Sequence, residues 1–181
     1  MKKVLLPLMA MVLSATTYNA MASHGTVKFT GEIKRSACEV TADTQNKEVY
    51  LGTYPTSAFK NIGDKSASKG FQVSIKDCDP GDYTMRFDGN TVPGHFELLS
   101  VSAEGSEGTS AATGIGIEIT DNNGNLLPIA DGSNISDSVA TVNVPVGQTT
   151  AVFNFQARYR SFGVVTPGLA NATSSFTIEY K

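Results

Sequence analysis

The sequence has no tryptophan, two cysteines, two histidines and few charged residues, which make up 17% of its 181 positions. So little cysteine and histidine excludes a cysteine-rich zinc site, and we predict no metal and no cofactor. Lys and Arg number 14 against 17 Asp and Glu, so the chain lacks the basic surface that nucleic-acid binding requires. Hydrophobic residues make up 40% of the chain, which is enough for one folded domain and argues against disorder.

The one long apolar run lies at the N-terminus. Residues 2–3 are lysines, Val4–Leu13 is apolar apart from Pro7, and Ala20-Met21-Ala22 supplies small residues for cleavage. The pattern predicts a secretory signal peptide over residues 1–22, with a cut after Ala15 as the alternative. The apolar run is too short to span a membrane.

Export changes the interpretation of the two cysteines. Cys38 and Cys78 both follow the predicted signal peptide, and an isolated pair in an oxidising compartment most often forms a disulfide. Closing a loop of about 40 residues removes roughly 4 kcal/mol of chain entropy from the unfolded state. A redox pair is the alternative, but that chemistry favours a C-x-x-C spacing, which is absent.

Apolar and polar residues alternate along most of the remaining chain, which predicts β-strands with one buried face. The alternating segments are 71–76, 83–87, 115–119, 142–144, 151–159 and 176–180. Turn sequences separate them, and Asn123-Gly124 predicts a hairpin. Short strands punctuated by turns predict a single all-β sandwich.

Candidate catalytic groups are scarce. His24 and His95 lie near no nucleophile motif, and no G-x-S-x-G or H-E-x-x-H sequence is present. Asp121–Asn125 resembles a calcium loop only faintly and is better explained as a turn. A secreted hydrolase of sandwich fold would need convergent polar residues, so we predict that the chain is not an enzyme.

The segment that precedes Cys38 also alternates. Val27, Phe29 and Ile33 share one side with Gly31. Residues 25–33 form either an ordinary first strand or an arm that pairs elsewhere. As a strand they would span about 30 Å, long enough to follow a sandwich edge.

Several sequence features together resemble one family, the pilins of the bacterial chaperone–usher pathway, of the type 1 fimbrial major-subunit kind. The features are Gly25–Ile33 before Ala37-Cys38, Ile75–Asp79, Phe155–Tyr159, Thr166-Pro167-Gly168 and Phe176–Lys181. Family members carry a glycine fourteenth from the C-terminus and a penultimate tyrosine, which here are Gly168 and Tyr180. The resemblance covers essentially the whole chain after residue 22.

The resemblance implies an incomplete immunoglobulin-like sandwich that lacks its last strand and is completed in trans by a donor strand. Residues 23–34 would be the donor arm and residues 35–181 the sandwich domain. A periplasmic chaperone would lend the missing strand first, and at the outer-membrane usher the arm of the next subunit would replace it. The product would be an extracellular fimbria that adheres to a host-cell receptor.

The resemblance also implies roles for individual residues. Val27, Phe29 and Ile33 would dock, and Gly31 would allow close backbone approach. Phe176 and Ile178 would line the acceptor groove. Gly168, Tyr180 and the carboxylate of Lys181 would be recognised by the chaperone, and a Cys38–Cys78 disulfide would staple the early strands.

A shaft subunit is the function that these features favour, and two other fimbrial roles stay open. A minor or linking pilin would share the same residues. A receptor-binding tip adhesin generally carries a separate lectin domain, for which the chain is too short. Many family arms are longer than this one, which has only Ser23 and His24 before Gly25. Gly25 would therefore occupy the outermost docking contact, unless an earlier cut lengthens the arm.

Overall fold

The computed structural model describes residues 25–33, 38–105, 108–130 and 139–181. The chain divides into two units, Met1–Lys34 and Arg35–Lys181, and each is described by itself. The predicted signal peptide lies outside the described residues, as do Ser23 and His24. Among the residues that are described, no helix has the length and apolar character needed to cross a membrane.

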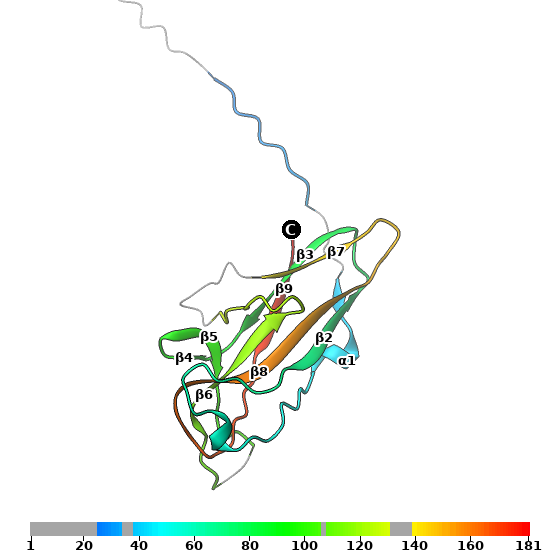
Figure 1. Ribbon diagram of the computed structural model, residues 1–181. Helices are drawn as coiled ribbons and strands as arrows, with labels where there is room; N and C mark the ends of the chain where they lie inside the picture. The colour runs from blue at the N-terminus through cyan, green and yellow to red at the C-terminus, as the bar shows by residue number, and fades with distance from the viewer. Residues whose placement is uncertain (1–24, 34–37, 106–107, 131–138) are drawn as a thin grey trace, which may run out of the picture. The chain divides into compact units, whose positions relative to one another are not determined.

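In the described residues of the second unit, the regular secondary structure is almost all β-strand, with one short α-helix and one 3-10 helix (Figure 1). In chain order the elements are β1 (Glu39–Val40), α1 (Ala42–Gln45), η1 (Thr56–Ala58), β2 (Lys69–Lys76), β3 (Gly81–Asp88), β4 (Thr91–Val92), β5 (His95–Ser100), β6 (Thr113–Asp121), β7 (Ala140–Val144), β8 (Ala151–Thr166) and β9 (Ser175–Tyr180).

These strands form two sheets. The larger sheet has the order β1-β2-β8-β6-β5-β4, and the smaller has the order β7-β3-β9. Neighbouring strands are antiparallel throughout, which suits a sheet with one face on the core and the other face toward solvent. The predicted all-β sandwich is confirmed.

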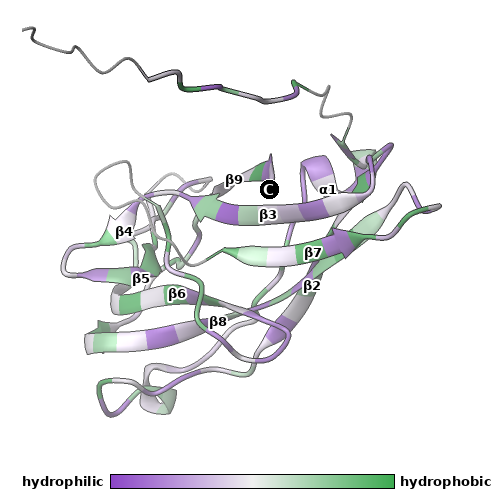
Figure 2. Ribbon diagram, turned by 90° about the horizontal axis from the view of Figure 1, so that it is seen from above, coloured by the Kyte–Doolittle hydropathy of each residue, from purple (hydrophilic) through white to green (hydrophobic). Residues whose placement is uncertain are grey.

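The core lies between the two sheets and is made by alternate residues of their strands. Val73 and Ile75 from β2 are buried, as are Tyr83, Met85 and Phe87 from β3. The residues between them are more exposed. This burial pattern follows the alternation of hydropathy along the strands (Figure 2). The predicted alternating segments all fall within strands, and they lie in β2, β3, β6, β7, β8 and β9.

The predicted turn at Asn123-Gly124 is also present. The Asp121 N–H donates to the Asn125 carbonyl at 2.9 Å, and Gly124 has a positive φ of 84°. Glycine is favoured at a position with positive φ, because glycine has no Cβ to clash with the backbone.

The first unit contributes the segment 25–33, which carries no regular secondary structure. Its apolar side chains are open to solvent, with Val27 76%, Phe29 91% and Ile33 101% exposed. The alternation of this segment predicts a strand, and the described residues 25–33 carry that pattern without forming one. We refer to residues 25–33 as the arm.

Candidate functional site

The last strand of the chain lies at the edge of the smaller sheet. β9 pairs with β3 over the register Tyr83↔Tyr180 to Asp88↔Ser175. In the part of the chain that the structure describes, no strand pairs with the other edge of β9. An unpaired edge exposes backbone donors and acceptors, which makes it a template for another strand.

The backbone groups that face this open edge follow from the pairing with β3. The Lys181 N–H donates to the carbonyl of Asp82, directly opposite, at 2.9 Å. In an antiparallel pair, alternate residues direct both their N–H and their C=O to the same neighbour. The residues between those bonded to β3 therefore present their backbone groups to the open edge. These residues are Phe176, Ile178 and Tyr180.

The remaining residues of β9 anchor it to β3 on the outer face of the sheet. Arg86 Nη1 donates to Glu179 Oε1 at 2.8 Å, and Thr177 Oγ1 donates to Asp88 Oδ2 at 2.9 Å. Hydrogen bonds to Asp88 and Glu179 raise the pKa of Arg86, so its positive charge is retained. β9 is thus fixed on one side and free on the other.

A cavity lined by largely apolar residues opens beside β9, and we call it the groove. Its volume is about 210 Å³. It is lined by Cys38, Val40, Ile75, Tyr83, Phe176 and Ile178. Phe176 and Ile178 are only half-buried, although both pack against the core. An apolar groove beside an unpaired strand edge can accept a further strand, with backbone bonds for pairing and pockets for alternate side chains.

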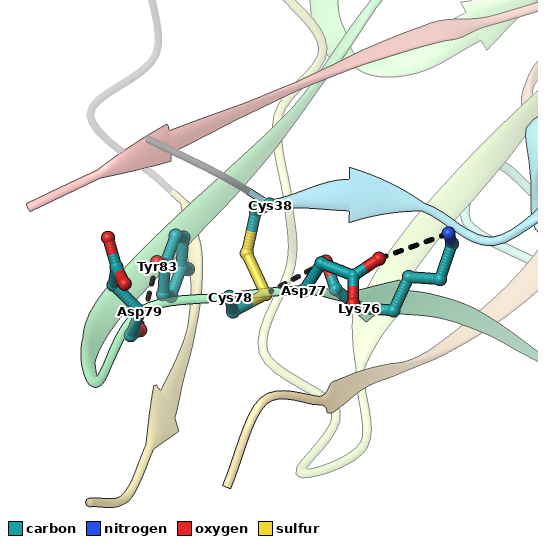
Figure 3. The surroundings of a disulfide bond; sticks show 6 residues. All are labelled: Cys38, Lys76, Asp77, Cys78, Asp79 and Tyr83. Carbon is teal, nitrogen blue, oxygen red and sulfur yellow. Dashed lines mark hydrogen bonds and ion pairs between the residues drawn. A yellow bond between two sulfur atoms is a disulfide. The ribbon is translucent and has the colours of Figure 1, made fainter. Parts of the chain in front are cut away.

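A disulfide forms one end of the groove. Cys38 is bonded to Cys78, so the predicted pairing is present in the structure. Figure 3 shows it joining the residue before β1 to the turn after β2, close to Tyr83. Tyr83 donates its hydroxyl to the Asp79 carbonyl at 3.0 Å, and burial raises the pKa of that hydroxyl. The bond fixes β1 beside β2 at the rim of the groove.

The structure brings together part of the predicted acceptor site. Phe176 and Ile178 line the groove, as expected. Tyr180 continues the same strand and packs edge-to-face on Tyr83, with ring centroids 5.3 Å apart. Gly168 lies elsewhere, against the backbone of residues 110–112, where an added Cβ would come within 2.4 Å of the Ala112 nitrogen. Recognition of Gly168, Tyr180 and Lys181 by a chaperone stays a prediction.

Three groove residues were not among the predicted site residues. Val40 lies in β1, which is too short to show alternation. Ile75 and Tyr83 belong to predicted strands and were assigned to the core by their alternation. What makes them groove residues is the missing neighbour of β9, which no local pattern in β2 or β3 reports.

Candidate metal-binding and catalytic side chains are few among the described residues. No group of three His, Cys, Asp or Glu side chains among them is placed to hold a metal ion. His95 lies on β5 with its Nδ1 3.3 Å from Glu97 Oε1 and its ring 5.4 Å from that of Phe162.

Comparison with known proteins shows the family to which the chain belongs. The family described as "Fimbrial protein" matches residues 27–181. The chain is 69% identical over 182 residues to a type-1 fimbrial protein subunit of Serratia marcescens, with all of both chains covered.

Solved structures share the fold. One is a chaperone–usher pilus studied for rod uncoiling, with a TM-score of 0.62, 19% identity and coverage of 92% of this chain and all of that one. Another is the P pilus rod subunit PapA, with a TM-score of 0.61, 17% identity and coverage of 81% and 100%. These likenesses confirm the predicted immunoglobulin-like sandwich that lacks a strand.

The family match covers residues 27–181, which include most of the arm, the groove and the last strand, and the relative from Serratia marcescens covers the whole chain. Members of this family are non-enzymatic components of surface pili. The chain belongs to the fimbrial protein family, and it is a structural fimbrial subunit.

Proposed function

We propose that this subunit polymerises by strand exchange, with the arm of one copy filling the groove of the next. One observation carries the proposal: an exposed, alternating apolar arm occurs in the same chain as an apolar groove beside an unpaired strand edge. Each feature alone is a liability in water, because exposed apolar surface and open edges promote aggregation. Pairing the arm with the groove removes both.

The energetics support the pairing. Burying Val27, Phe29 and Ile33 contributes about 1.5–3 kcal/mol each. Backbone bonds to Phe176, Ile178 and Tyr180 add to this, since these residues direct their backbone groups to the open edge. In a homopolymer every groove except the terminal one is filled, and every arm but one is docked.

An open groove needs protection before assembly. We therefore assign the subunit a periplasmic chaperone that lends a strand to β9, and an outer-membrane usher at which the arm replaces that strand. The predicted signal peptide supplies entry to the periplasm. Lys181 follows β9 and is exposed, and we assign its carboxylate to recognition by the chaperone.

The test replaces one docking side chain with a charge. In Phe29→Asp, a carboxylate would enter an apolar groove, which is costly without a partner. We expect a soluble, chaperone-bound subunit that is absent from fibres sheared from the cell surface. The matched control is Thr26→Asp, which places the same charge on the opposite side of the arm and is expected to assemble. Wild-type fibre yield from Phe29→Asp would contradict the proposal.

A further inference from the structure

The larger sheet carries a second hollow, which shares no residue with the groove. Its base is formed by residues 70–72 of β2 and 154–156 of β8, and its volume is about 510 Å³. We call it the amide hollow. We propose that it binds an acidic carbohydrate, with Lys47 on the sugar carboxylate and side-chain amides on the sugar hydroxyl groups.

The pairing of β2 with β8 places the amide hollow on the outer face of the sheet. Gly70 lies opposite Gln156, and Gln72 lies opposite Asn154. Phe153 alternates with Asn154 along β8 and is buried in the core, so Asn154 and its neighbours on this face are directed away from the core. The groove is lined by residues from the core side of both sheets, and a strand that fills it would leave the amide hollow open.

Gly70 provides the space at the centre of the amide hollow. An added Cβ at this position would meet nothing closer than the Phe155 carbonyl oxygen, 3.9 Å away. The neighbouring strand positions on this face carry the long side chains of Gln72 and Gln156, so the missing side chain of Gly70 leaves a depression between them. Glycine within a strand costs stability and often marks a place where a ligand approaches the backbone.

The lining of the amide hollow is rich in groups that both donate and accept hydrogen bonds. Gln72 Nε2 donates to Asn154 Oδ1 at 2.8 Å. This bond leaves the amide oxygen of Gln72, and the whole amide of Gln156, without a hydrogen bond to any described residue. A side-chain amide donates and accepts at once, as a sugar hydroxyl does. Small-molecule sites of this size are usually lined by apolar side chains, so this lining favours a ligand that is polar over most of its surface.

The turn after β6 adds a further amide to the lining. Asn122 borders the amide hollow. The carboxylate of Asp121 accepts hydrogen bonds from the backbone N–H groups of Asn123 and Asn125 and from the Asn125 side chain, each at 2.8 Å. These bonds hold the turn in shape and occupy the Asp121 carboxylate within it. The sequence Asp121–Asn125 is therefore a turn that presents an amide to the hollow.

Charge complementarity favours a carbohydrate that carries a carboxylate. The lining contains one charged residue, Lys47, which is exposed, and it contains no carboxylate. Asp43 on α1 senses the charge of Lys47 without a hydrogen bond to it. One lysine among amides suits the single carboxylate of a uronic or sialic acid residue. Phosphate recognition favours arginine forks, and the lining has no arginine.

Binding can be measured by titrating the purified subunit with defined oligosaccharides. The acidic probes are sialyllactose, which carries a sialic acid, and a hyaluronan tetrasaccharide, which carries uronic acids. Lactose is the neutral control. We expect saturable binding of at least one acidic probe, about tenfold tighter than lactose because of the hydrogen bond to a charged group. That binding should weaken as the salt concentration rises. The probe that binds identifies the kind of sugar acid.

Variants of the lining test whether the amide hollow is the site. Gly70→Leu places a side chain in the hollow and should abolish binding of the acidic probe. Lys47→Gln should weaken that binding about tenfold. The matched control is Lys69→Gln, which removes the same charge from an exposed residue of β2 outside the lining and should bind as wild type does. Guanidinium unfolding of each variant verifies that it is folded.

The proposal has clear contrary results. The absence of saturable binding of both acidic probes would overturn it, and so would lactose binding as tight as theirs. Wild-type affinity in Lys47→Gln, or an equal loss from Lys47→Gln and Lys69→Gln, would also overturn it. Lys47 is exposed, so Lys47→Gln keeps the test decisive if Gly70→Leu fails to fold. The titration uses single subunits, so none of these results bears on strand exchange.

Discussion

The ring of Tyr180 lies directly over Gly81. An added Cβ on Gly81 would come within 2.5 Å of Tyr180 Cε2 and 2.8 Å of its hydroxyl oxygen. Gly81 begins β3 and Tyr180 ends β9, so this contact closes the end of the pairing that holds the last strand. The groove depends on β9 keeping its position while its other edge is empty.

Gly81→Ala is therefore expected to displace the Tyr180 ring and loosen the end of β9. Overpacking of this kind costs about 1–3 kcal/mol of unfolding free energy, and the positive φ of 155° at Gly81 adds backbone strain for any residue with a Cβ. The measurement is guanidinium unfolding of the purified subunit. Gly70→Ala is the matched control, since its Cβ would meet nothing closer than the Phe155 carbonyl oxygen at 3.9 Å.

A double variant makes the cause explicit. If the clash with Tyr180 is responsible, Gly81→Ala should cost less in a Tyr180→Ala background. An equal cost in both backgrounds would show that the ring is not what Gly81 accommodates.

Gly31→Val should affect assembly without affecting the subunit. In the arm itself, a Cβ on Gly31 would meet nothing within 4 Å, so the unfolding free energy should not change. In the exchanged state the added side chain would crowd the groove beside Phe176 and Ile178, and this overpacking would cost about 1–3 kcal/mol. Fibre yield, and the guanidinium concentration at which fibres dissociate, should both fall.

Gly25→Val is the control for that variant. Gly25 is equally open in the arm, and it precedes Val27, the first apolar side chain of the arm, so its only expected contact with the groove is the outermost one. Its fibres should be as stable as wild type. Equal loss from Gly25→Val and Gly31→Val would mean that the arm tolerates no added side chain anywhere, and the groove contact would not be specific.

Replacing Cys38 and Cys78 together with serine should lower the unfolding free energy of the subunit by about 2–4 kcal/mol. The loop they close spans 40 residues, and Cys38 also lines the groove. Less chaperone–subunit complex should then accumulate in the periplasm. Unchanged unfolding and unchanged complex would show that the bond is dispensable for keeping the groove open.

Acid should weaken the larger sheet through one buried carboxylate. Burial tends to raise the pKa of Glu118, but hydrogen bonds and charge from Lys65 and Arg158 outweigh it and hold that pKa below its usual value. Lys65 Nζ and Arg158 Nε lie 2.9 and 2.8 Å from Glu118 Oε1, and Arg160 Nη1 lies 3.1 Å from Oε2.

A carboxyl with a lowered pKa stabilises the fold above its unfolded pKa, near 4.3, and loses that contribution as the pH falls through the folded value. Unfolding free energy should therefore fall below about pH 4. Glu118→Gln should lose about 2 kcal/mol at neutral pH and show a flatter acid limb. Glu48→Gln, at an exposed position, is the control and should follow the wild-type curve. A wild-type pH profile from Glu118→Gln would contradict this role.

Alternation predicted most strands because each of them buries one face. β5 escaped prediction because Leu98 and Leu99 are both buried, so the segment does not alternate. Glu118 was expected on the outer face of β6, and it lies there, but the side chains of Lys65, Arg158 and Arg160 cover it. The loop 60–66 runs alongside β8 and supplies Lys65. Gly63 in this loop donates to the Ser161 carbonyl at 2.9 Å. Such covering depends on a loop that is distant in sequence.

The candidate site, too, could be predicted from the sequence only in part. Phe176 and Ile178 follow from alternation in the last strand and from the family resemblance. The contact between Gly81 and Tyr180 does not, because the two residues meet only through the register of β3 with β9. The arm shows the limit most clearly, since its alternation predicts a strand, and under the proposed strand exchange the partner of that strand belongs to another molecule.

The most direct test of the account is a gel of protein sheared from the cell surface, run in SDS without and with heating. Strand exchange predicts a ladder of multimers in the unheated lane and a monomer band after heating, because the subunits are held by buried side chains and backbone bonds and not by covalent links. A monomer in both lanes would contradict the claim that the arm of one copy fills the groove of the next.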